Sequence, residues 1–278
     1  MSNEEILGGK FEPIYAAHAI EQVAFMLRFE PAIEKTTFEE VQKLADAFKA
    51  ELPIKSHFEG VTITPGAIPT QSKGCVLSRT GPDGEIESEL RLDHNSITFR
   101  TTRYSRWLDV WQHACKYLDV LIPVFVKGAK IEGIGLNYVD KFKWSGDVAN
   151  CQPNKLLLKQ SKYICPNVFE EPDFWHSHTG AFRKIDGNTK RLMNINIDYL
   201  DEIRPLSLEQ NESRRVVAIT TVLTDLFNQP GYSNLEVAAE NAVGFINEAM
   251  QKLHLENKKL LGEVINEDMK KRIALTTN

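Results

Sequence analysis

The most suggestive polar cluster in this sequence is WHSH, at residues 175–178. Residues two apart on a strand point to the same face, so His176 and His178 would present their imidazoles together. Zinc sites use three or four protein ligands, so the pair needs further donors. Asp198 is the favoured one, because it lies on a strand expected to neighbour that of the histidines. Two other possible donors are His113 and Asp186.

The same histidine pair also fits an ordinary solvated strand start. No HExxH or CxxC motif completes a ligand set, and no Walker loop, nucleophile elbow or kinase motif is present. Gly133-x-Gly135 lacks the third glycine of a dinucleotide fingerprint. We therefore expect no cofactor and a non-enzymatic protein. The alternative is a metal-dependent hydrolase or nuclease that uses His176 and His178.

A second candidate site lies on the sequence KIEGIGLNYVDKFKW, at residues 130–144, which predicts a central strand. Its alternation sends Asn137 to one face of the sheet, and Tyr138 and Asp140 to the other. These three side chains could bind a ligand or partner, or Tyr138 and Asp140 could simply pair with a neighbouring strand. Gly133 and Gly135 predict a place where another group packs close to the backbone.

The elements that would position these residues begin with a half-buried strand at residues 20–29. Thr37 and Glu40 form a capping-box pattern, which predicts a helix that starts there and stops at Pro53. Turn sequences then separate an antiparallel set of strands. The clearest element is an amphipathic helix at residues 105–122, with two tryptophans on its apolar side. The antiparallel strands predicted before this helix are 57–64, 75–79, 85–93 and 96–102.

The second half repeats the order of strands followed by a long helix, without a visible residue repeat. Residues 146–174 are rich in Pro, Asn and Lys and predict a connection between lobes. An apolar stripe at residues 235–253 predicts the long helix, and Asn266 predicts the cap of a short final one. The sequence therefore predicts an α+β fold of two lobes, 1–144 and 145–278, each an antiparallel sheet backed by a long helix. The predicted strands of the second lobe are 179–184, 191–199 and 214–226.

Composition limits the class of protein. The chain has 278 residues, 42% hydrophobic and 26% charged, which is typical of a globular protein with a sizeable core. Its net charge of −5 argues against bulk electrostatic binding of nucleic acid, although a local contact through the basic C-terminus stays open. No apolar run is long enough to span a membrane. The four cysteines lack paired spacing, so we expect free thiols in a reducing cytoplasm.

Three stretches resemble an uncharacterised family of bacterial proteins of about this length. Its members are sporadically distributed and often lie near mobile or defence genes. Residues 19–29 resemble the opening strand of the family, residues 133–141 its G-φ-R-Y-φ-N strand, and residues 253–269 its closing helix. Asn137 stands where the family has Arg, and Asp140 where it has Asn. The resemblance implies a shared fold. It also implies that whatever the family binds at these two positions is bound differently here or not at all, and it implies no reaction.

Together these observations favour a cytoplasmic binding or interaction protein with a protein partner. The gene neighbourhoods of the similar family suggest an immunity, antitoxin or phage-defence accessory. A third hypothesis is a small-ligand sensor.

Overall fold

The computed structural model describes residues 9–62, 70–205 and 211–276. Ten strands in these ranges form one antiparallel sheet in the order β3-β4-β5-β6-β2-β7-β10-β9-β8, and β1 pairs with the end of β7. The strands are β1 Lys10–Pro13, β2 Ile20–Glu30, β3 Ile54–Thr62, β4 Thr70–Thr80, β5 Ile86–Asp93, β6 Ser96–Thr101, β7 Lys130–Ser145, β8 Trp175–Lys184, β9 Lys190–Pro205 and β10 Asn211–Leu226. The α-helices are α2 Lys35–Ala45, α3 Trp107–Phe125, α4 Ala242–Gly262 and α5 Glu267–Arg272.

The sheet is arranged around the antiparallel pair β2 and β7. Each of these strands is the first long strand of its half, and it pairs with the last strand of the same half, β6 or β10. The remaining strands follow outward in reverse chain order. A long helix follows each set, α3 after β6 and α4 after β10. The expected repeat of strands and helix is therefore present in the chain order, around a shared centre.

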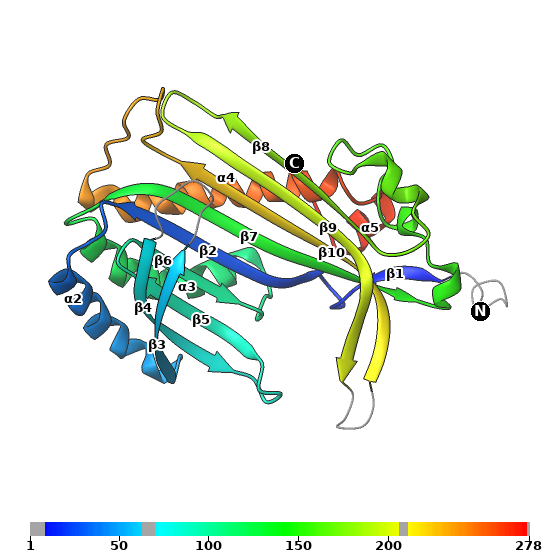
Figure 1. Cartoon of the computed structure of the whole chain (residues 1–278), viewed down its shortest axis with the longest axis horizontal. Coiled ribbons are helices and arrows are strands. Elements are labelled where there is room, and N and C mark those ends of the chain that lie inside the picture. Colours follow the sequence, from blue (N-terminus) through cyan, green and yellow to red (C-terminus); the bar gives the residue numbers. More distant parts are fainter. Residues whose placement is uncertain (1–8, 63–69, 206–210, 277–278) are drawn as a thin grey trace.

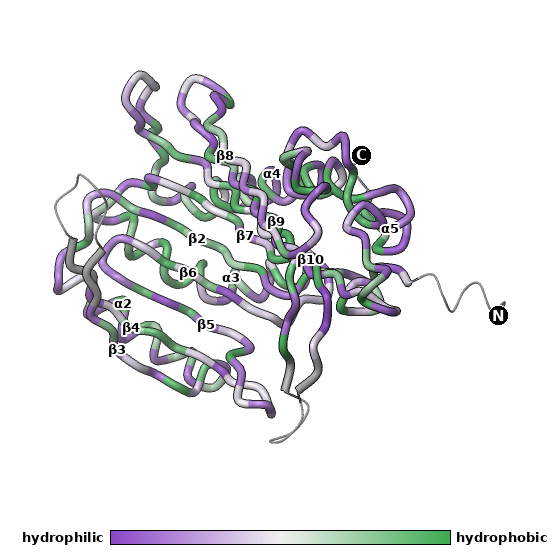
Figure 2. The backbone as a smooth tube through the Cα atoms, turned by 45° about the vertical axis from the view of Figure 1, so that its right-hand side comes forward, coloured by the Kyte–Doolittle hydropathy of each residue, from purple (hydrophilic) through white to green (hydrophobic). Residues whose placement is uncertain are grey.

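The two long helices lie on one face of this sheet. Figure 1 looks onto the other face, and α3 and α4 pass behind β2, β7 and β10. The predicted core is confirmed, because Phe25 on β2 packs 5.1 Å from the ring of Trp111 on α3, measured between centroids. Ile134 and Leu136 on β7 are buried beside them. Hydrophobic and hydrophilic residues alternate along the strands (Figure 2), and the buried hydrophobic ones form this core.

The α+β class is confirmed, and the two-lobe arrangement is not. The strands of both halves lie in one sheet, because β7 pairs with β2 on one side and with β10 on the other. The sequence shows which faces of these strands are apolar, but it does not show which strands are neighbours. The division into residues 1–144 and 145–278 as separate domains stays a prediction.

Several element boundaries differ from the predicted ones. The helix α2 starts at Lys35 and has no side-chain cap, so the capping box at Thr37 is wrong. Pro123 does not end α3, which continues to Phe125. The helix α4 starts at Ala242, and the part of its predicted stripe before residue 239 is extended instead. The cap at Asn266 is confirmed, since its Oδ1 accepts a 2.9 Å hydrogen bond from the amide of Met269.

The connection at residues 146–174 consists of loops and short 3-10 turns, among them Pro166–Glu170. All four cysteines are free thiols, as expected. Among the described helices, none has the length and apolarity that crossing a bilayer requires. The predicted close approach is present at Gly135, where an added Cβ would lie 2.8 Å from Cε of Met26. At Gly133 the nearest atoms would lie at an ordinary 3.5 Å.

Candidate functional site

The central strand β7 separates the three predicted binding residues. Tyr138 and Asp140 are buried on the face that the helices cover, each with 1% exposure. Asn137 is half-buried on the opposite face, between Ala24 of β2 and Val222 of β10. The structure therefore places Asn137 in a different environment from the other two, as the alternation predicts. The three residues do not form one site.

We call the face without α3 and α4 the open face. Strand register places small and hydrogen-bonding side chains in rows across its middle. Most of these residues are half-buried, which is the exposure of a strand residue with no layer packed upon it. The middle of the open face comprises Gln22, Ala24 and Met26 on β2, Gly135, Asn137, Val139 and Lys141 on β7, Ala218, Thr220, Val222 and Thr224 on β10, and Asn194, Asn196 and Asp198 on β9. His176 and His178 continue this face on the edge strand β8.

Several charges on and beside this middle are balanced within the sheet. Lys141 has a 12% exposed side chain, and its Nζ lies 2.6 Å from Glu21 and 2.5 Å from Glu202. Burial is the largest single influence and lowers the pKa of Lys141, but the hydrogen bonds and charges of Glu202 and Glu21 together outweigh it, so the pKa is raised above its usual value. Arg100 on β6 pairs with Glu89 through two 3.2 Å contacts. The paired charges, carboxamides and hydroxyls of this surface can hydrogen-bond a partner, but they do not create a region of positive electrostatic potential.

Large apolar side chains lie at the margin of the open face. Phe182 on β8 is 60% exposed, and its register partner Leu192 lies in the row of Thr224 and Gly135. The ammonium of Lys190 lies 4.4 Å from the centre of the Phe182 ring. Leu200 on β9 is 37% exposed. Exposed aromatic and aliphatic groups beside a polar surface are typical anchors of protein interfaces.

The covered face carries a buried polar cluster between β7 and the two long helices. The hydroxyl of Tyr138 lies 3.1 Å from Nδ1 of His254 on α4 and hydrogen-bonds the hydroxyl of Tyr104. Trp107 on α3 stacks on the His254 ring with centroids 4.1 Å apart and planes 1° from parallel. The Trp107 indole N–H donates to Gln251, one turn before His254. These contacts join α3, α4 and β7 through hydrogen bonds as well as apolar packing.

Asp140 adds a carboxyl group to this cluster. Its Oδ2 is buried without a hydrogen-bond partner among the described residues. Desolvation raises the pKa of Asp140 to about 7. Desolvation also lowers the pKa of His254 to about 4, since burial disfavours the charged form of both groups. At neutral pH the imidazole of His254 is therefore uncharged, and Asp140 is at the midpoint of its titration.

The structure brings the predicted metal ligands to one face. His176 pairs with Asp198 across β8 and β9, and His178 pairs with Asn196. Both histidines are exposed at the edge of the sheet. Asp198 Oδ2 accepts a 2.7 Å hydrogen bond from the Asn196 amide. Among the residues that the structure describes, no three His, Cys, Asp or Glu side chains form a group that could hold a metal ion.

The two other possible donors lie elsewhere. His113 is on α3, on the far side of the sheet, where its Nε2 lies 3.2 Å from Glu51 and 3.0 Å from the hydroxyl of Tyr117. Asp186 is in the turn after β8, and its Oδ1 accepts hydrogen bonds from the amides of Asn188 and Thr189. His113 therefore cannot join the histidine pair, and Asp186 stabilises its own turn.

Sequence comparison adds no relative from which a function could be transferred, because no known family model and no curated protein matches the chain. Evidence about function therefore comes from the geometry of the molecule.

The sequence interpretation did not identify the open face, although a signal for it exists. Asn194, Asn196 and Asp198 alternate with buried Ile195 and Ile197, so the polar side chains of β9 share one face. Thr220, Val222 and Thr224 on β10 follow the same period of two. The signal that these faces are contiguous is the strand order, which places β9, β10, β7 and β2 side by side.

Proposed function

We propose that this chain is a non-enzymatic interaction protein that binds a protein partner through the open face of its sheet. The observation that carries the proposal is that the four strands β2, β7, β10 and β9 present a contiguous surface of small apolar and polar side chains, and none of the described helices packs on it (Figure 1). A sheet that binds nothing on this side would gain stability from a second covering layer. Antiparallel sheets also tolerate a solvated face, so the proposal depends on the chemistry of the surface.

That chemistry supports a protein partner over nucleic acid. Binding to phosphates needs unpaired lysines and arginines, whereas Lys141 and Arg100 are paired with carboxylates of the same sheet. Phe182 and Leu200 supply apolar anchors at the margin. The resemblance to a family found near mobile or defence genes supports an immunity, antitoxin or phage-defence accessory role in the bacterial cytoplasm.

Photo-crosslinking in the native host tests this proposal. A photoreactive amino acid replaces Thr220 or Asn196 on the open face, and Leu108 on the outer side of α3 serves as the control position. Leu108 is 62% exposed, so the control is fully accessible. We expect one and the same protein to crosslink at Thr220 and Asn196 and not at Leu108. Crosslinks only to nucleic acid, or equal crosslinks at all three positions, would contradict the proposal.

A further inference from the structure

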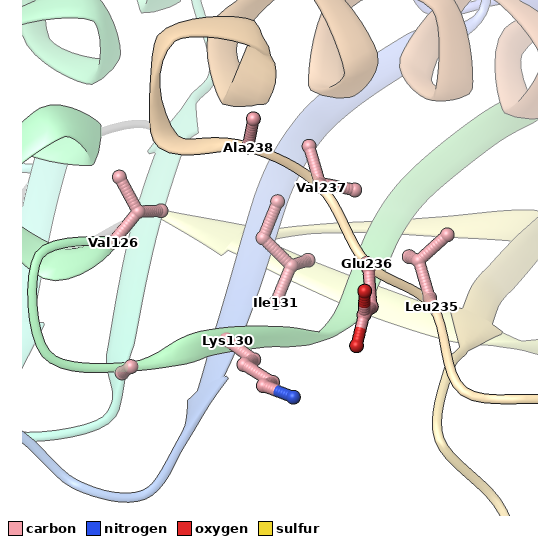
Figure 3. A pocket seen from close by; sticks show the side chains of 8 residues that line it. Val126, Lys130, Ile131, Leu235, Glu236, Val237 and Ala238 are labelled. Carbon is pink, nitrogen blue, oxygen red and sulfur yellow. The ribbon is translucent and has the colours of Figure 1, made fainter.

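A cavity of about 460 Å³ lies away from the open face, where α3 ends and β7 begins (Figure 3). One wall is the turn from α3 into β7, and the other is the extended segment 235–238 that precedes α4. The lining residues are Val126, Ala129, Lys130, Ile131, Leu235, Glu236, Val237 and Ala238.

The cavity exists because β10 stops pairing before β7 begins. The last register pair of these strands is Leu226 with Gly133, so β10 leaves the first residues of β7 without a strand neighbour on that side. The chain then turns at Asn228, which has a positive φ of 56°. The side chain of Asn228 accepts a 2.8 Å hydrogen bond from the amide of Leu235 and donates a 3.5 Å one to the carbonyl of Ile131. Segment 235–238 is thus held beside β7 without pairing to it.

The chemistry of the cavity is apolar inside and charged at the mouth. Figure 3 shows the side chain of Ile131 directed toward the segment that carries Val237 and Ala238, and the side chains of Lys130 and Glu236 extending the opposite way. Lys130 and Glu236 are exposed, and neither has an ion pair or a side-chain hydrogen bond within the described ranges. The backbone amides of Glu236 and Val237 likewise have no partner there. Two opposite charges therefore lie among the apolar residues that line the cavity.

We propose that this cavity binds an aliphatic α-amino acid of the leucine, isoleucine and valine class. The branched side chain would pack against Val126, Ile131 and Val237, and the α-carboxylate and α-ammonium would pair with Lys130 and Glu236. A fatty acid would bring its carboxylate beside Glu236, and an aliphatic amine would bring its cation beside Lys130, so only a zwitterion satisfies both. The volume lies within the range of small-molecule sites and exceeds that of one amino acid, so ordered water would share it.

This proposal is independent of the proposed function, because the cavity and the open face share no residue. Isothermal titration of the full chain with L-leucine tests it, with leucinamide as the probe that lacks the carboxylate and 4-methylpentanoate as the probe that lacks the ammonium. The matched variants are Lys130→Met and Glu236→Gln. The control is Lys127→Met, which removes a nearby exposed lysine whose Nζ lies 3.4 Å from Glu40.

We expect saturable binding of one leucine per chain, and a loss of affinity of about tenfold or more for each probe and each cavity variant, as for a charge-assisted contact. Lys127→Met should bind leucine as the wild type does. Thermal melting of the free variants should be unchanged, since both charged residues are exposed. The proposal is overturned if leucine gives no saturable heat at millimolar concentration, if 4-methylpentanoate binds as tightly as leucine, or if Lys130→Met retains wild-type affinity.

Discussion

The two faces of β7 differ in what their polar groups do. On the covered face, Tyr138 is fully buried and hydrogen-bonded to His254, and Asp140 is buried with one oxygen unpartnered. On the open face, Asn137 and Lys141 lie in rows of half-buried polar side chains, and the charge of Lys141 is balanced. The same strand thus places one set of alternate residues in the core beneath the helices and the other set on the open face, although Oδ1 of Asn137 is itself buried without a hydrogen-bond partner among the described residues. Substitutions on the two faces should separate these roles.

The largest expected effect is on the covered face. Trp111→Ala removes an indole that packs on Phe25 and donates to Asn247 on α4, so it leaves a cavity and an unpaired amide. We expect it to lower the free energy of unfolding by about 3–5 kcal/mol in urea titrations. Leu108→Ala on the same helix is the control, and its change should stay within about 0.5 kcal/mol. Equal effects of the two variants would show that α3 does not cover the core.

The next effect depends on pH. The pKa of Asp140 is about 7 in the folded chain and 3.8 in an exposed reference state, so the folded state holds one more proton between these values. Stability that Asp140 provides when protonated is therefore lost as pH rises from about 4 to 7, by about 4 kcal/mol in total. Asp140→Asn should remove this loss and be more stable than wild type at pH 8. Denaturant titrations at several pH values measure this change in stability. If Asp140→Asn were less stable than wild type at pH 8, the claim that the buried carboxylate of Asp140 destabilises the fold would be refuted.

The titration of His254 changes the free energy of unfolding with pH in the opposite direction. Its pKa falls from 6.5 in the exposed state to about 4 in the fold, so the unfolded state holds one more proton between these values. Stability is lost as pH falls through this window, by about 3 kcal/mol. The contributions of Asp140 and His254 therefore offset each other between about pH 4 and 6.5 in wild type. We expect Asp140→Asn to make stability rise with pH there and His254→Gln to make it fall. Parallel profiles for the two variants would contradict this offset.

The smallest expected effect is at the sheet edge. The double variant His176→Ala, His178→Ala changes two exposed rings, so its free energy of unfolding should stay within about 1 kcal/mol of wild type. On our account the purified wild-type protein holds no stoichiometric metal, and the variant keeps its fold. Elemental analysis of both proteins measures the first point. Stoichiometric zinc, manganese or iron that is present in wild type and absent from the variant would make the hydrolase hypothesis the leading one.

The periodicity of apolar residues was sufficient to predict most helices and strands, and to predict which side chains of each strand share a face. The alternation around Asn137, Tyr138 and Asp140 predicted their two faces, and the tryptophan stripe predicted the core side of α3. The pairing of β2 with β7 could not be predicted, because antiparallel neighbours share no local sequence signal across more than 100 residues. The helix predicted over segment 235–238 was also wrong, although the apolar spacing at Leu235 and Ala238 suits a helix. The hydrogen bond that the amide of Leu235 donates to the side chain of Asn228, together with the proximity of β7, instead holds it in a non-helical conformation.

The role of the open face is tested most directly by comparing Phe182→Ala with Leu108→Ala. The two residues are 60% and 62% exposed, but Phe182 lies on the sheet edge beside the open face and Leu108 on the outer side of α3. With the partner identified by crosslinking, the measurement is the dissociation constant of each variant at matched folding. We predict that Phe182→Ala weakens binding at least about tenfold, as expected for an aromatic anchor, and that Leu108→Ala leaves it unchanged. Unchanged binding by Phe182→Ala, or an equal loss in both variants, would contradict the assignment of the open face as the interaction surface.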